Sequence, residues 1–429
     1  MRLMQLSFIY LMWLCQFSPA FAQPWHEQIP SALAPFSGQA QQLAKLTGDG
    51  ILIYSHPEQK LLLPTFQEQR PVSAQFYSAA LVVPASAMQV QQILLDFKNY
   101  HRLFPTLKSV TRKTSAQGIP QYQYQVHIPT PIPVLNFKES IMMQHHHSAH
   151  KIASLVISAP LPYGVGQLEW FDLGDNHTLI TLTQWADLNH SKGFLVGQIL
   201  KALPDVKLGL PTSVNAFLME ALQDKFKSHT PLLQADFPEP IWNTAQWQQI
   251  STISQKSNTP VGYIHPKILS PYLGKNEPLR FSSSYLYLPE KQNRLETWIQ
   301  PAALQPLFPS IIRQANFQKI DAQQQNAHYK VSVGLGVIRI PFHFHLRFQQ
   351  LNAHQTQFYA TSGDIKTVKG KMQLIAHEQG TLLKLTSSIK IDQDAPFLIR
   401  AMRSLPYHEM LPALGGNTVY ALKVRNKVK

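Results

Sequence analysis

The sequence predicts an α+β protein with two similar halves, each an antiparallel sheet followed by a long helix. Three observations support this class. Segments in which apolar and polar residues alternate, the pattern of half-buried strands, fill the middle of each half. These segments follow one another without helices between them, which favours antiparallel pairing. Short motifs also recur in the same order in both halves, which indicates an internal repeat.

Residues 81–105 form the clearest unit of this repeat. The unit begins with an apolar strand that ends at Pro84, because proline has no N–H to donate to a sheet. Ser86 can cap the helix that follows, whose apolar residues recur at helical spacing. Residues 285–309 show the same order, and a Leu-Phe-Pro sequence closes both units.

The first unit resembles the opening of START-like domains of the polyketide cyclase, dehydrase and coenzyme-Q-binding group. In that group a strand and a Pro-Ala turn precede an amphipathic helix, an Asp-Phe-x-x-Tyr motif and a Phe-Pro. The resemblance implies a helix-grip fold, in which a curved antiparallel sheet wraps around a long C-terminal helix and leaves a cavity. In the second half Ile299-Gln300-Pro301 stands where the Asp and Tyr region belongs, so membership there rests on the repeat. The matching residues of the first unit are Val83-Pro84-Ala85, Asp96-Phe97-Lys98-Asn99-Tyr100 and Phe104-Pro105.

The first 22 residues are typical of a secretory signal peptide, with an early arginine, an apolar run and Ala20-Phe21-Ala22 at the end. A retained membrane anchor is the alternative, and the shortness of the apolar run favours cleavage. Cys15, the single cysteine, would leave with this segment. The mature chain would then have no disulfide, thiol nucleophile or cysteine-based zinc site. We expect an exported protein, periplasmic if the source is a Gram-negative bacterium.

The repeat predicts two START-like domains, at residues 47–227 and 259–427, after an N-terminal leader at 23–46. Between them, residues 228–258 contain two tryptophans, Trp242 and Trp247, which free linkers rarely carry. We expect this segment to pack against a domain as a short helix.

Period-two alternation predicts five strands in the middle of each half, and a helical stripe predicts a helix at each end. In the first half the expected strands are 121–128, 134–143, 152–158, 166–173 and 178–188, with the helix at 210–226. In the second half they are 328–335, 338–349, 355–361, 371–377 and 380–391, with the helix at 414–424.

The formal net charge is +14, and the basic residues are scattered along the chain. A basic exported protein meets anionic lipid headgroups more often than nucleic acid, so peripheral contact with an anionic membrane is one expectation and an evenly basic surface is the other. No nucleic-acid partner is expected. The predicted turns 131–135 and 336–338 are unusually apolar, which suits either membrane contact or burial between the domains.

No catalytic signature is present. The sequence has no Gly-x-Ser-x-Gly, phosphate loop or dinucleotide fingerprint, and its strand carboxylates have no counterparts in the other half. We predict no catalytic residue, no metal and no cofactor. The His145-His146-His147 run is interpreted as a polar turn rather than a metal site. His343 and His345 share one strand face, which either lines a polar cavity end or faces water.

The leading hypothesis is a non-enzymatic carrier of a lipid, quinone or polycyclic molecule bound between sheet and helix. A cofactor-independent cyclase or hydratase, and an envelope interaction module with filled cavities, are the alternatives. For each candidate wall residue, ordinary core packing is the alternative. The predicted ligand-binding residues are Tyr122, Tyr124, Trp170, Trp185 and Phe217 in the first half; Tyr329, Phe342, Phe344 and Phe358 in the second; and Leu195, Val196 and Phe397 in lid segments before the two helices.

Overall fold

The protein is described from a computed structural model. The described residues are 24–64, 69–128, 137–159, 163–190, 204–226, 231–335, 338–393, 395, 400, 403 and 406–428. Among them, no helix has the length and apolar character needed to cross a bilayer.

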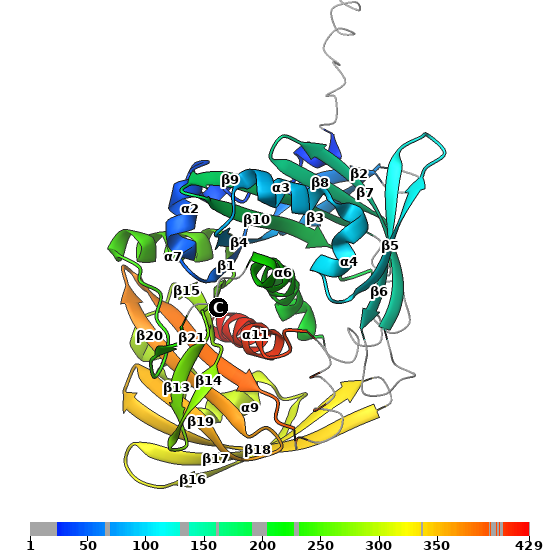
Figure 1. Ribbon diagram of the computed structural model, residues 1–429. Helices are drawn as coiled ribbons and strands as arrows, with labels where there is room; N and C mark the ends of the chain where they lie inside the picture. The colour runs from blue at the N-terminus through cyan, green and yellow to red at the C-terminus, as the bar shows by residue number, and fades with distance from the viewer. Residues whose placement is uncertain are drawn as a thin grey trace, which may run out of the picture.

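The architecture is α+β and is dominated by one antiparallel sheet of 16 strands. The sheet curls around two helices, α6 (Val206–Phe226) and α11 (Met410–Val428), which lie side by side on its concave face (Figure 1). The strands of the first half are β1 (Ile51–Ser55), β4 (Tyr77–Val83), β5 (Leu107–Thr114), β6 (Pro120–Ile128), β7 (Phe137–Ser148), β8 (Lys151–Ser158), β9 (Gly164–Gly174) and β10 (His177–Ala186). Those of the second half are β12 (Val261–Ile264), β15 (Ser282–Leu288), β16 (Ile312–Lys319), β17 (Gln324–Leu335), β18 (Ile338–Asn352), β19 (Gln355–Gly363), β20 (Thr367–His377) and β21 (Gly380–Lys390).

The strand order is the same when read inwards from either edge of the sheet. From β5 it runs β6-β7-β8-β9-β10-β4-β1, and from β16 it runs β17-β18-β19-β20-β21-β15-β12. The two series meet where β1 pairs antiparallel with β12, with Leu52 opposite Tyr263. The halves therefore share one continuous sheet, whereas the sequence analysis expected a separate sheet in each. Alternation along a strand predicts which face is buried, but it does not say which strand lies beside it.

The two long helices approach closely at a pair of glycines. A Cβ atom on Gly209 of α6 would lie 2.9 Å from the carbonyl oxygen of Gly415 on α11, so no larger residue fits there without movement. Each helix also carries an asparagine that holds it to the sheet. Asn215 accepts from the Gln184 amide at 3.2 Å, and Asn417 accepts from the Ser387 hydroxyl at 3.0 Å.

The outer, convex face is covered by two short helices and two hairpins. α2 (Ala40–Thr47) and α7 (Thr244–Ser257) lie over the centre of the sheet, and the Trp242 indole donates to the Leu46 carbonyl at 2.9 Å. The segment that contains the two tryptophans thus packs against the sheet as expected, with a helix that begins at Thr244, after Trp242. The hairpins are β2 (Gln59–Pro64) with β3 (Gln69–Ala74), and β13 (Ile268–Tyr272) with β14 (Lys275–Leu279), the latter extended by β11 (Leu233–Gln234).

Short helices complete each half between the first strands and the edge strand. α3 (Ala87–Leu95) begins with a capping box between Ser86 and Gln89, which agrees with the expected cap. It is followed by η3 (Phe97–Asn99) and α4 (Tyr100–Leu103). In the second half α8 (Gln292–Leu295), η5 (Glu296–Ile299), η6 (Pro301–Ala303) and α9 (Leu304–Leu307) take the same place in the chain. Two further short helices, η1 (Trp25–Glu27) and η2 (Ala34–Phe36), precede β1.

One sequence interpretation of local structure is wrong, and another is right only in part. His145, His146 and His147 do not form a turn, because β7 continues to Ser148 and pairs with β8 throughout. The apolar stripe predicted for α6 (Leu210, Val214, Phe217, Leu218, Ala221 and Leu222) is buried only in part: Ala221 and Leu222 are buried and Val214 is 38% exposed, while Asn215, Ala216 and Met219, outside the stripe, are fully buried.

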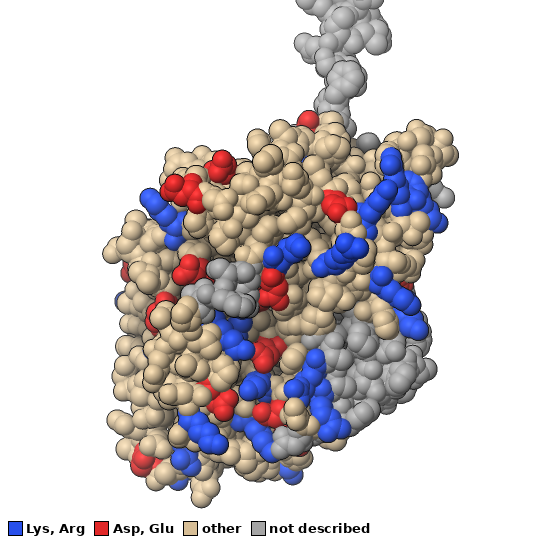
Figure 2. Space-filling model, in the orientation of Figure 1, with Lys and Arg blue, Asp and Glu red and all other residues tan. Residues whose placement is uncertain are grey.

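Lys and Arg side chains are spread over the face seen in Figure 2, with Asp and Glu side chains among them. The visible face therefore carries both signs of charge.

Candidate functional site

Several apolar side chains on the concave face of the first half remain only half-buried. Since this face looks onto the long helices, full burial would be the ordinary result of close packing. The half-buried set lies on β6 to β9 and on α6 and consists of Tyr122, Ile141, Met143, Val156, Leu168 and Leu218.

Strand register identifies the matching positions in the second half. Met143 lies opposite Val156 on β8, just as Leu346 lies opposite Ala360 on β19. The two residues of the first half are half-buried, whereas Leu346 is 3% exposed and Ala360 is completely buried. The same part of the concave face is thus closed in the second half and open in the first.

A difference in side-chain size explains the closure. Ser154 lies opposite Gly166 in the first half, and the equivalent pair in the second half is Phe358 opposite Gly370. The Phe358 ring lies directly over Gly370, where a Cβ atom would be 2.2 Å from the ring. Serine beside glycine supplies no comparable ring, so this place in the first half lacks the side-chain volume that fills the second.

The open face carries three connected polar groups. The Tyr124 hydroxyl lies 2.7 Å from Nε2 of His145, and Nδ1 of His145 lies 2.8 Å from the Ser154 hydroxyl. The register-equivalent residues of His145 and Ser154 are Phe348 and Phe358, so this network belongs to the first half only.

The environment of His145 keeps the imidazole neutral. Its ring stacks on Phe97, with 4.4 Å between centroids and 7° between planes. Burial lowers the pKa of His145 to about 4. Near neutral pH one ring nitrogen therefore donates a hydrogen bond and the other accepts one. The hydrogen bonds from Tyr124 through His145 to Ser154 can then all run in the same direction.

Trp170 adds an unsatisfied donor to the same face. Its side chain is 1% exposed, and the indole N–H has no hydrogen-bond partner among the described residues. An unmade buried hydrogen bond costs roughly 1–3 kcal/mol, which a bound water or a ligand oxygen would recover.

The predicted wall residues of the first half separate into two faces. Tyr122, Tyr124 and Trp170 lie together on the concave face, and Phe217 on α6 is half-buried against Tyr407, with 5.4 Å between ring centroids. Trp185 does not lie there, because it alternates with the inward-facing positions of β10 and packs under the β2–β3 hairpin.

In the second half the predicted residues act mainly as core. Tyr329 is fully buried and donates to the Pro301 carbonyl at 2.8 Å. Phe342 and Phe344 pack on the concave core, and Phe358 fills the space over Gly370. Leu195, Val196 and Phe397 lie outside the described residues.

Three residues of the open face were not predicted from the sequence: His145, Ser154 and Gly166. The signal was present in the repeat, since aligning strand by strand places Ser154 against Phe358 and His145 against Phe348. Finding it requires the exact strand register, which includes a bulge between Met142 and Met143.

Glu169 is a buried carboxylate on β9, and it has a structural role. It lies on the outer face, 7% exposed, and accepts from the Ser31 hydroxyl at 3.1 Å and from the Ala32 N–H at 3.0 Å. Burial raises its pKa despite these bonds. Glu169 therefore anchors the N-terminal leader rather than serving the concave face.

Two buried histidines near the central seam repeat one set of contacts in both halves. His56 Nε2 lies 2.7 Å from the Ser78 hydroxyl, which lies 2.6 Å from that of Thr183. The second set is His265, Ser283 and Thr386, with distances of 2.7 and 2.8 Å.

No protein-family model matches the chain, and no curated protein matches it either. Similar solved structures include a START superfamily protein from Mycobacterium smegmatis, 18% identical, covering 35% of this chain and 96% of that chain with a TM-score of 0.27. The di-domain ARO/CYC StfQ from the steffimycin biosynthetic pathway is 11% identical and covers 82% of this chain and 97% of that chain at 0.26. An aromatase/cyclase from Streptomyces sp. R1128 is 18% identical and covers 35% and 96% at 0.28. At such identities and TM-scores the likenesses carry no functional argument.

Proposed function

We propose that the protein binds and carries a hydrophobic ligand on the concave face of its first half. The observation that carries this proposal is the difference between equivalent positions: Ser154 opposite Gly166 where the second half has Phe358 over Gly370. Burial of the half-exposed apolar side chains by a ligand would contribute at ~25 cal/mol per Å² before the costs of binding.

The polar network indicates which part of the ligand lies deepest. Tyr124 and neutral His145 can offer a donor and an acceptor to a hydroxyl or carbonyl group. A lipid, quinone or polycyclic molecule with one oxygen function at an otherwise apolar end fits this arrangement.

The repeated strand order supports a tandem arrangement of two START-like helix-grip domains, each with its sheet and its long helix. In this arrangement each domain also includes the helix that precedes its first strand, because α2 and α7 take matching places on the outer face. The second domain has a filled interior and supports the first through the shared sheet. A signal peptide cleaved before Gln23, export to the periplasm and peripheral contact with anionic lipid are further parts of the proposal.

The first prediction tests the binding face by filling it. Ser154→Phe reproduces the aromatic residue of the second half, so the protein should still fold, with a melting temperature lowered by the loss of the Ser154–His145 hydrogen bond. Binding of the uncharged fluorescent probe N-phenyl-1-naphthylamine should weaken about tenfold or more, because the ring occupies the ligand volume. Thr111→Phe adds the same ring at an exposed site on β5 and should leave probe binding unchanged. Equal probe affinity in Ser154→Phe and wild type would refute the proposal.

A cofactor-independent cyclase or hydratase is the second candidate, favoured by the Tyr124–His145–Ser154 chain. Neutral imidazole between two hydroxyls has the composition of a general acid–base group. Native mass spectrometry of protein purified from its own envelope separates the two. One bound compound recovered unchanged supports a carrier, and a mixture of substrate and product that shifts with time supports an enzyme.

A further inference from the structure

A recess lies on the outer face of the second half, on the opposite side of the sheet from the concave face. It has a volume of about 320 Å³ and lies between the β13–β14 hairpin and strands β19 and β20. Its apolar walls are Phe237, Tyr272, Leu273 and the strand around Tyr359, and its polar walls are Gln357, Lys369 and Asp236.

The turn at the mouth of this recess has an unusual residue. Tyr272 pairs with Lys275, so the hairpin turns on two residues, Leu273 and Gly274, with φ of 47° and 80°. Positive φ at both positions is the geometry that Asn-Gly adopts at least cost, and a leucine there is strained. Leu273 is also 59% exposed. It therefore carries strain and exposes apolar surface, and neither stabilises the free protein.

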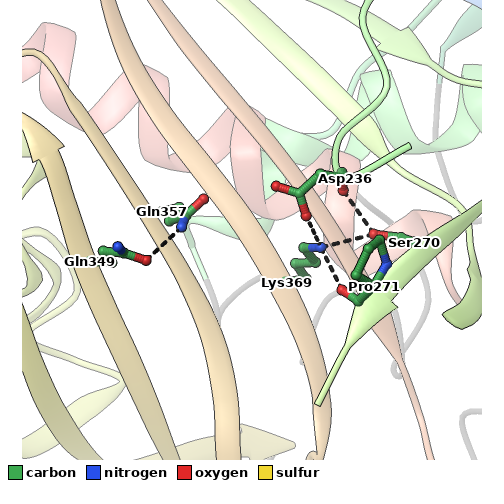
Figure 3. Close-up of polar contacts among 6 residues, drawn as sticks. All are labelled: Asp236, Ser270, Pro271, Gln349, Gln357 and Lys369. Atoms are coloured by element: carbon green, nitrogen blue, oxygen red, sulfur yellow. Dashed lines mark hydrogen bonds and ion pairs between the residues drawn. The ribbon is translucent and has the colours of Figure 1, made fainter. Parts of the chain in front are cut away.

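Hydrogen bonds hold the polar wall formed by Lys369 and Asp236 in place. The Lys369 ammonium donates to the Asp236 carboxylate, to the Ser270 hydroxyl at 2.9 Å and to the Pro271 carbonyl at 2.7 Å (Figure 3). All three of its protons are used, so Lys369 fixes the wall and is not available to a ligand. Gln357 donates to Gln349 at 2.8 Å at the side of the recess away from Lys369.

Two neighbouring cations have no carboxylate partner in the described part of the chain. Lys371 lies opposite Gln357 across the β19–β20 pair, and its ammonium is 5.7 Å from the Phe237 ring centroid. Arg347 lies opposite Tyr359 on the other side, and its Nε donates to the Asn326 amide oxygen at 3.2 Å. Neighbouring strands lie ≈ 4.8 Å apart, so Arg347 on β18 and Lys371 on β20 lie one strand to either side of β19, which carries Tyr359.

We propose that this recess binds an organic anion with an apolar or aromatic body. The body lies between Phe237, Tyr272 and Leu273, and the anionic group lies near Lys371 or Arg347. Contact with the ligand accounts for the strained leucine, and the cations account for the preference for negative charge. This site is separate from the concave face and does not depend on the function proposed for it.

The experiment uses 8-anilinonaphthalene-1-sulfonate, an aromatic anion, and its uncharged relative N-phenyl-1-naphthylamine. Both are titrated against the full mature chain carrying Ser154→Phe, in which the concave face is filled, and against wild type. Leu273→Asn creates the preferred Asn-Gly turn, so the melting temperature should stay level or rise while sulfonate binding weakens about fivefold or more. Lys371→Gln should weaken sulfonate binding by a similar factor and leave the uncharged probe within about twofold. Lys113→Gln, on exposed β5, is the matched charge control.

The proposal is overturned if both Leu273→Asn and Lys371→Gln bind the sulfonate within about twofold of their parent, or if Lys371→Gln weakens both probes equally. Failure here is separable from failure of the carrier proposal, because that one is measured by the effect of Ser154→Phe on the uncharged probe.

Discussion

At the scale of single residues, three buried histidines make stability depend on pH. Burial lowers the pKa of His56 to about 4, and burial, with Lys384 and Arg280 nearby, lowers that of His265 to about 3. His145 shifts in the same direction. An unfolded histidine titrates near 6.5, so between pH ~6.5 and ~4 the unfolded chain binds more protons. The free energy of unfolding therefore falls as pH falls through this range, by up to ~1.4 kcal/mol per pH unit for each histidine.

Urea denaturation at pH 7.5 and pH 5 measures this effect. The double variant His56→Gln, His265→Gln should lose part of the pH dependence and keep the part due to His145. Replacing exposed His147 should change nothing. A double variant as acid-sensitive as the wild type would contradict the assignment.

The segment between the halves, residues 228–258, offers a second test at this scale. Glu239 pairs with Lys384, whose side chain is 3% exposed. Glu239→Gln leaves a buried ammonium without its counter-charge, which should destabilise the protein by roughly 2–4 kcal/mol. Glu277→Gln removes the partner of Lys390 in a pair 3.6 Å apart and about one-third exposed, so the expected loss is below ~1 kcal/mol. Chemical denaturation measures the free energy of unfolding of both variants. Equal losses of stability would show that the burial of Lys384 does not make its ion pair the stronger one.

At the scale of elements, Phe358 tests why the second half is closed. Phe358→Ser removes the ring over Gly370 and should leave a cavity, with a loss of roughly 3–5 kcal/mol by analogy with phenylalanine-to-alanine changes. The same variant should bind N-phenyl-1-naphthylamine in the second half, adding to the binding of the first. Thermal melts with probe titration check both results. A stable variant without added binding would mean that neighbouring side chains collapse into the space.

Patterns among neighbouring residues in the sequence predicted helices and strands well, but they predicted contacts between those helices and strands poorly. The Ser86 cap and the strand near Val83 follow from nearest neighbours and agree with the structure. Edge strands β5 and β16 were missed because charged and polar residues fill them, which masks the alternation and protects a free edge. Among the site residues, aromatic type alone found Tyr122 and Tyr124, but not His145 or Ser154, whose meaning depends on which residues face them across the sheet.

At the scale of the whole molecule, the shared sheet makes each half depend on the other. Residues 23–227 expressed alone would expose the edge of β1 and the apolar surface that α7 and β12 cover. We expect this fragment to associate through β1 rather than to remain a monomer, because a long unpaired apolar edge recruits another strand. Light scattering of the purified fragment tests this expectation. A monomer that melts near the temperature of the full chain would refute it.

The seam also determines when the native state can form. Leu52 and Tyr263 are paired across the centre of the sheet, although nearly half of the chain separates them in sequence. Contacts so distant require closure of a long loop before they give any stabilisation, and they slow folding. In a chain that emerges with its N-terminus first, β1 can pair with β4, but its other edge stays unpaired until β12 has been synthesised. During that interval the molecule is a substrate for chaperones, and substitutions at the seam should change the refolding rate more than the final structure.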